Sequence, residues 1–397
     1  MFGKASIILI LGFSAIFLLY TQRFTGFSDT SVENYVDYYS ESMAASMALT
    51  GANMAANQIF LNQSWTEGFN NIAFNNGRIN VTVNTLNIVQ REVVSIGTFN
   101  SVNREVRILL QPSNFAKFAY YTSIMPGNLW FVTGDTIWGP MHIQGNLNVF
   151  GTPVFNGKVT LRNQLRLFNA ASNPRFFGGF ETGVSIPMPG NVDALIAASN
   201  SGGRNFRNTD LFITFNADGT VTWRAGTSGN FVTEPLSTFA PNGSIVTERG
   251  NVHVSGTLNG RVTLAATHSS GTGHGNVFLV NDLVYRQNPL TGPSQDMLGL
   301  VATNNIIIRD VPANRGDMNI HGSLLSLGGG LMAENHGSIG RQGAINLVGG
   351  IIERQAQPTG VFDPGTGQIT SGYNSRFIYD ERFMLTSPPF FPVTGSL

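Results

Sequence analysis

The hydrophobic pattern of the chain changes from one long helical segment to many short alternating segments. Residues 5–20 are uncharged, and the uncharged stretch continues to Gln22, before Arg23. At about 1.5 Å rise per residue, such a helix covers roughly 27 Å, which is enough to cross the core of a bilayer. Because the sequence around Tyr20 offers a poor signal-peptidase site, we expect a retained membrane-spanning helix with the bulk of the chain outside.

The helix is expected to continue beyond the apolar run, because residues 28–58 contain no proline and a single glycine. Small residues recur in this part at spacings of three and four, which permits close approach between neighbouring helices. The alternative is that the same face packs on the chain's own domain. The positions predicted to pack in a shared helical core are Gly12, Ala44, Ala48, Gly51, Ala52 and Ala55.

One acidic residue occurs every four residues in the same stretch, so four carboxylates fall on nearly one face of the helix. In an isolated helix these carboxylates repel one another weakly. The stripe is either a solvated face or a surface that meets basic groups of neighbouring subunits. The residues predicted for such electrostatic contacts between subunits are Lys4, Arg23, Asp29, Glu33, Asp37 and Glu41.

Beyond Trp65 apolar and polar residues alternate, as they do in half-buried strands. The alternation is seen over residues 79–83 and 106–110, with residues 93–99 between them. The change of pattern therefore predicts a helical segment over residues 1–64, followed by a β-meander over residues 65–120 that covers the outer half of the helix.

Four copies of one pattern, G-x-Φ-[H/N]-Φ-x-G-x-Φ with Φ apolar, begin at Gly139, Gly250, Gly316 and Gly343. Two inward apolar positions, a glycine bend and a further apolar position make one rung of a β-solenoid. We therefore predict an α+β fold whose residues 121–386 form a β-helix or solenoid-like domain. An insertion is expected at about 162–240, and a tail rich in proline and aromatic residues at 387–397, which packs either on this domain or on a neighbouring subunit.

The layout resembles that of type IV pilins, and residues 33–39 and 49–55 are similar to the helix of pilin-like surface proteins with PilX-type N-termini. Residues 133–140 and 379–392 resemble the C-terminal half of the same family. The resemblance implies a structural subunit of an extracellular filament at the cell surface, with adhesion as one task. It also implies three partners: copies of the chain in a helical filament, the inner membrane before assembly, and the pilus assembly machinery.

The composition excludes several kinds of chemistry. The 397 residues carry 23 basic and 23 acidic side chains and no cysteine, and charged residues make up 12%. Without cysteine there is no disulfide, thiolate metal site or cysteine nucleophile. Without net charge or a basic patch, we expect no nucleic-acid partner.

No cluster of catalytic side chains is evident, so we expect no catalytic residue, no cofactor and no metal, and no enzyme. His142, His253 and His321 lie in the repeats, and the first two are expected to point outward. Five acidic residues of the repeat region show no shared register: Asp296, Asp310, Asp317, Glu334 and Glu353. The alternatives are a minor pilin or pseudopilin, and a membrane-anchored β-solenoid enzyme acting on polysaccharide, which needs clustered carboxylates.

Overall fold

The computed structural model describes residues 2–62, 64–86, 90–110, 114–268, 273–365 and 369–394. The chain forms two compact units, Met1–Pro112 and Ser113–Ser396, named unit 1 and unit 2. The predicted α+β class is confirmed, because one long helix is followed by many strands. Within that helix, side chains outside the described part are those of Phe2, Lys4, Ala5, Thr25, Ser28 and Asp29.

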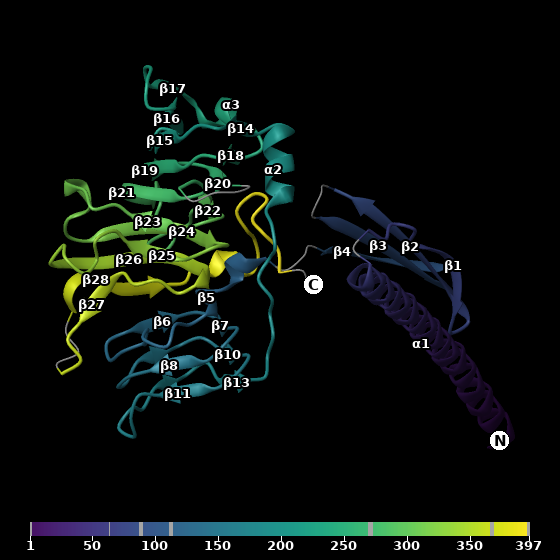
Figure 1. The fold of residues 1–397 in the computed structure, drawn as a ribbon. Coiled ribbons are helices and arrows are strands. Elements are labelled where there is room, and N and C mark those ends of the chain that lie inside the picture. The colour runs from purple at the N-terminus through teal and green to yellow at the C-terminus, as the bar shows by residue number, and fades with distance from the viewer. Residues whose placement is uncertain are drawn as a thin grey trace. The chain divides into compact units, whose positions relative to one another are not determined.

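Unit 1 consists of a 60-residue helix, α1 (Phe2–Leu61), and an antiparallel sheet that packs on its second half (Figure 1). The helix can run this far because no proline occurs before Pro112. Three strands fall where the alternation predicts them, whereas β1 is mostly exposed and therefore shows no alternation. In sheet order the strands are β1 (Phe69–Phe74), β2 (Gly77–Thr85), β3 (Arg91–Phe99) and β4 (Val102–Leu110).

Two tight hairpins shape this sheet. Asn75 and Asn76 join β1 to β2, and Asn100 and Ser101 join β3 to β4, all four with positive φ. Positive φ at both loop positions matches the twist of the flanking strands, and asparagine adopts it more readily than most residues.

The helix lies unusually close to the sheet because small residues meet at the contact. Gly51 of α1 lies over Ser95 and Ile79, and Gly97 of β3 lies directly under the helix backbone at Ala44. The apolar residues of the surrounding core are Met47, Ala55, Ile59, Ile79, Val81, Val83 and Val93.

Unit 2 consists of short strands that pair mostly in parallel and stack in successive coils, in the manner of a solenoid (Figure 1). Its helical elements are η1 (Phe115–Lys117), α2 (Asp193–Asn200), α3 (Leu236–Phe239), η2 (Pro312–Asn314) and η3 (Glu381–Met384). Its strands are β5 (Tyr120–Ile124), β6 (Thr136–Trp138), β7 (Met141–Ile143), β8 (Leu147–Val149), β9 (Val154–Phe155), β10 (Val159–Leu161), β11 (Leu165–Leu167), β12 (Arg175–Phe176), β13 (Phe180–Thr182), β14 (Arg204–Arg207), β15 (Leu211–Phe215), β16 (Thr220–Ala225), β17 (Val232–Pro235), β18 (Ser244–Glu248), β19 (Val252–Leu258), β20 (Arg261–Thr267), β21 (Val277–Tyr285), β22 (Met297–Ala302), β23 (Ile306–Ile308), β24 (Met318–Ser326), β25 (Leu331–Ala333), β26 (Arg341–Gln355), β27 (Gly360–Phe362) and β28 (Ile369–Ile378).

One side of the coils forms a parallel ladder in the order β14–β18–β20–β22–β24–β26–β5–β7–β10–β13. A single register position passes along it, and Leu300, Leu324, Ile351, Tyr120 and Met141 occupy successive strands there. Stacking apolar side chains in register gives each coil a partner on both sides, so one continuous core forms.

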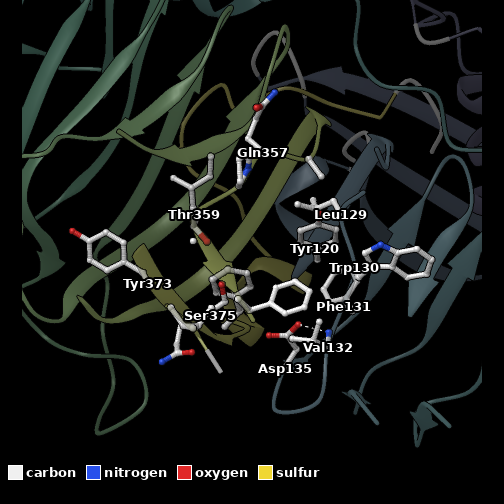
Figure 2. Close-up of a pocket in the computed structure, with 18 of the residues that line it drawn as sticks. Tyr120, Leu129, Trp130, Phe131, Val132, Asp135, Gln357, Thr359, Tyr373 and Ser375 are labelled. Atoms are coloured by element: carbon white, nitrogen blue, oxygen red, sulfur yellow. Dashed lines mark hydrogen bonds between the residues drawn. The ribbon is translucent and has the colours of Figure 1, made fainter. Parts of the chain in front are cut away.

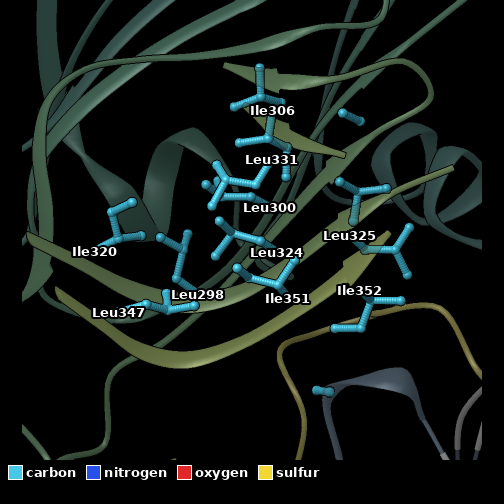
Figure 3. Packing of buried hydrophobic residues seen from close by; sticks show 14 of the residues in the cluster. Leu298, Leu300, Ile306, Ile320, Leu324, Leu325, Leu331, Leu347, Ile351 and Ile352 are labelled. Carbon is cyan, nitrogen blue, oxygen red and sulfur yellow. The ribbon is translucent and has the colours of Figure 1, made fainter. Parts of the chain in front are cut away.

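The apolar core has a layer on each face of this ladder. Figure 3 shows Leu324 and Ile351 on one face of β24 and β26, and Leu325 and Ile352 on the other. All four side chains are buried. Because both faces are buried, the sequences of the ladder strands are continuous apolar runs and do not alternate between apolar and polar residues.

The chain enters the ladder in its middle. Strands β5 to β13 form a first stack, and residues 183–203, which include α2, then lead to the opposite end of the ladder, where β14 begins a second stack. The second stack ends where β26 pairs with β5 and β28 pairs with β6. We name this junction of the two stacks the seam.

The repeat copies are used in two ways. The copies that begin at Gly316 and Gly343 stack directly, because β24 pairs with β26 at the spacing that separates them. The copies at Gly139 and Gly250 contribute β7 and β19, which lie on different sides of the coils. The pattern thus describes a strand with a glycine corner, which any side of a coil can use.

The region 162–240 differs from the expected insertion. Strands β11 to β13 complete the first stack, and β14 and β15 begin the second. The parts of this region that depart from the coil pattern are β16 and β17, which pair antiparallel beside β15, the helix α3 and the connecting residues 183–203. Strands of two or three residues are too short for a period of two to be recognised.

The C-terminal tail packs on unit 2 itself. The hydroxyl of Thr263 donates a hydrogen bond to the carbonyl oxygen of Pro389, and the N–H of Phe115 donates to that of Pro392 at 3.1 Å. Phe391 is buried. Of the two alternatives for the tail, the structure has packing on its own domain.

Candidate functional site

The first half of α1 is an uncovered apolar surface. The segment Ser6–Phe24 is long and apolar enough to cross a membrane, and no part of it is buried by the described residues. Its large apolar side chains from Ile7 to Tyr20 are between 58% and 71% exposed. Contiguous apolar surface of this kind is a contact surface for lipid or protein.

Five of the six predicted helix-packing positions lie against the sheet of unit 1. Ala44, Ala48, Gly51, Ala52 and Ala55 are buried there. Their small size therefore serves the contact within the chain, which was the stated alternative. Packing between subunits stays a prediction for this set, and it requires a face that the sheet leaves free, as at Gly12, where a Cβ would meet no atom within 4 Å.

The acidic stripe is only partly free. Glu33 and Asp37 are exposed, as is Arg23, whereas Glu41 forms an ion pair of 2.5 Å with Arg104 of β4. The side chains of Lys4 and Asp29 lie outside the described residues. Electrostatic contacts between subunits stay a prediction, and Glu41 already has a partner in its own chain.

Replacing Arg104 by alanine is expected to lower the free energy of unfolding of unit 1 by less than about 1 kcal/mol. The physical reason is that the two side chains are 46% and 52% exposed, so water screens the pair. Denaturation of the full chain in detergent micelles measures this, with the exposed Glu33→Gln as a control. A loss of about 2 kcal/mol or more would show that Arg104 also supports packing.

A cavity of about 820 Å³ lies at the seam of unit 2. On the second side of the coils, β15, β19, β21, β23 and β25 stack in parallel, and β8 and β11 form a separate pair. Between β25 and β8, no strand among the described residues continues this side, and two segments take its place: the loop 125–135, and residues 356–365, which include β27. The cavity is lined by these segments together with β5, β26 and β28 (Figure 2).

Glu353 is the most deeply buried acid of this cavity, at 3% exposure. Its Oε1 accepts a hydrogen bond of 2.6 Å from the hydroxyl of Tyr120, and its Oε2 accepts one of 3.2 Å from the N–H of Leu331. Burial raises the pKa of Glu353 from 4.5 to about 8, against the effect of these two hydrogen bonds. At neutral pH the carboxyl group is therefore mostly uncharged.

Asp135 is the second carboxyl group of the lining. Its Oδ2 accepts a hydrogen bond of 2.8 Å from the N–H of Val132 (Figure 2). Burial raises the pKa of Asp135 to about 6. Asp135 lies in an irregular loop where no hydrophobic period marks it, so the sequence pattern does not predict it as a site residue. It does lie in residues 133–140, which carry part of the family resemblance.

The three repeat histidines do not come together. His142 points away from the coil interior as expected, but it is buried, where it contacts Thr160 Oγ1 at 2.8 Å and stacks on Tyr121. His253 stacks between two phenylalanines, and His321 accepts a hydrogen bond from the N–H of Tyr285. In the described part of the chain, no group of three or more potential ligands could hold a metal ion.

The comparisons with known proteins give likenesses to solved structures. No family model matches the chain, and no curated protein matches it. Among solved structures, the chain is similar to the competence-associated pilin ComZ from Thermus thermophilus, with 11% identity, over 89% of this chain and 94% of that one, at a TM-score of 0.38. A TM-score this low does not establish a common fold.

Proposed function

We propose that the chain is a structural subunit of an extracellular, type IV pilus-like filament that assembles through α1. The observation that carries the proposal is the uncovered apolar segment Ser6–Phe24, on a helix whose second half already packs on its own sheet. The resemblance of residues 33–39 and 49–55 to PilX-type helices supports the same assignment.

The helix has a suitable environment both before and after assembly. In the inner membrane, lipid covers the apolar segment, and a helix satisfies its own backbone hydrogen bonds there. In a filament, the same segments of other copies replace the lipid, and one contact repeated without closure gives a helical polymer. The sheet of unit 1 and the whole of unit 2 then face the exterior at the cell surface, where adhesion is the task we propose.

The proposed partners are other copies of the chain, the membrane before assembly and the pilus assembly machinery. We propose no nucleic-acid partner and no enzymatic activity.

Sheared surface material, viewed by electron microscopy and analysed by mass spectrometry, tests the assignment. If the chain stays with detergent-solubilised membranes and is absent from the fibres, a minor pilin or pseudopilin is favoured. Release of reducing or unsaturated sugars by the full chain would instead favour the polysaccharide enzyme.

Replacing Gly12 by leucine is expected to abolish filaments and to leave both β-rich units folded. The added side chain occupies the space in which neighbouring helices would approach, and a Cβ at this position has no atom of the rest of the chain within 4 Å. Counting fibres by electron microscopy, with circular dichroism of the purified variant, measures both effects. Gly12→Ala is the matched control and should form fibres; normal fibres from Gly12→Leu would contradict close packing at this position.

A further inference from the structure

We propose that the cavity at the seam binds a neutral oligosaccharide. The assignment goes beyond the filament, because every described residue of the lining belongs to unit 2. A volume of about 820 Å³ falls within the 300–1,000 Å³ that is usual for small-molecule sites.

Aromatic rings line the cavity and are held in place by other rings. The ring centroids of Trp130 and Phe168 are 5.2 Å apart, and those of Phe131 and Tyr120 are 5.3 Å apart. In both pairs the rings are nearly perpendicular. Both loop aromatics are half-buried, so each retains surface for a ligand. A pyranose ring presents a face of C–H groups, and an aromatic surface fixed in advance binds such a face without ordering cost.

Uncharged hydrogen-bonding groups lie across the cavity from these rings. Figure 2 shows Gln357, Thr359 and Ser375 on the side opposite Trp130. Within the described residues, the side chains of these three form no hydrogen bond with another residue, and all are partly exposed. Amide and hydroxyl groups both donate and accept, which suits the hydroxyl groups that a sugar must desolvate on binding.

The charge of the lining disfavours an acidic ligand. Its acidic groups are Asp135 and Glu353, of which Glu353 is buried and hydrogen-bonded to Tyr120. The basic side chains of the lining are Arg376, which is exposed, and His336, which is partly exposed and contacts the carbonyl oxygen of Ala333 through Nδ1 at 3.1 Å. An anionic saccharide would therefore approach Asp135 without a buried cation to offset the repulsion, whereas a neutral one meets no such cost.

Isothermal titration calorimetry of the full chain, in a zwitterionic detergent that has no sugar headgroup, tests the proposal. The probes are the neutral hexasaccharides of glucose, xylose and N-acetylglucosamine, with hexagalacturonate and an uncharged hexapeptide as comparisons. We expect at least one neutral hexasaccharide to bind at one site per chain, and neither comparison probe to bind.

The variants locate the site. Trp130→Ala is expected to weaken binding at least tenfold, and Thr359→Val, which keeps the side-chain volume, about threefold to tenfold. Phe231→Ala removes a 52% exposed aromatic outside the cavity and should bind as the unaltered chain does. Thr359→Val decides the matter if Trp130→Ala fails to fold.

Three results would overturn the proposal: no neutral hexasaccharide binds the folded chain, hexagalacturonate or the peptide binds in its place, or both folded cavity variants bind as tightly as the unaltered chain. Filaments of Thr359→Val are expected to look normal, so a failure of sugar binding and a failure of assembly are separate results.

Discussion

Replacing Gly97 by alanine is expected to lower the free energy of unfolding of unit 1 by about 3 kcal/mol, the upper end of the usual cost of overpacking. A Cβ at this position would lie 2.2 Å from the carbonyl oxygen of Ala44 and 2.5 Å from the backbone N of Ala48. Both atoms belong to the backbone of α1, so no side-chain rotation relieves the contact. The helix must therefore move away from β3 and lose its packing on the sheet.

Hydrogen exchange of the full chain in detergent micelles measures the effect of Gly97→Ala, because the backbone amides of β2 and β3 should lose protection while those of unit 2 keep it. Gly26→Ala is the matched control, since Gly26 lies in α1 and a Cβ there meets nothing within 4 Å. It should be neutral or slightly stabilising, by up to about 1 kcal/mol. Unchanged protection of β3 in Gly97→Ala would contradict the close approach of helix and sheet.

The stability of unit 2 is expected to fall by a few kcal/mol as the pH rises toward 9. The pKa of Glu353 is raised from 4.5 to about 8 in the folded chain. A carboxyl group with a raised folded pKa contributes stability that is complete below its unfolded pKa and is lost as the pH passes through the folded value. Ionisation places a charge in the buried contact with Tyr120 and Leu331, where no cation compensates it among the hydrogen-bond partners.

Thermal unfolding of the full chain between pH 5 and pH 9 measures this dependence. Asp135 has a raised pKa of about 6 and contributes in a lower range, so the interval from pH 7 to pH 9 isolates Glu353. Glu353→Gln should remove the fall in that interval, because the amide stays neutral and still accepts a hydrogen bond. Glu334→Gln, a partly exposed acid paired with Arg309, should keep it. If Glu353→Gln shows the same fall as the unaltered chain, another group is responsible.

The sequence predicts the fold class and the long helix because these depend on local patterns. The absence of proline and the run of apolar residues fix α1, and alternation over residues 79–83 fixes β2. The contact between them was left open, because small residues permit close approach to a helix and to a sheet alike. Gly97 of β3 lies directly under the helix backbone, which shows that the small residues of α1 contact the sheet. Predicting this contact requires knowledge of which residues of α1 and β3 meet.

The cavity could not be predicted in the same way. Its walls come from residues 125–135 and 356–365, which are adjacent only because the two stacks of unit 2 meet there. Glu353 and Tyr120 are 233 positions apart in the chain, and no local period connects them. A sequence pattern records the neighbours along one strand, whereas the order in which strands join the ladder is a property of the whole unit.

The entry of the chain into the middle of the ladder also orders the events of folding. A chain is synthesised from its N-terminus to its C-terminus, so β5 and β6 are made early. Their partners β26 and β28 lie near the C-terminus and are made late. Until those strands arrive, β5 and β6 have unpaired edges, at which two chains can pair wrongly. The cavity is therefore completed last, so a chain with a complete cavity has folded along the full length of unit 2.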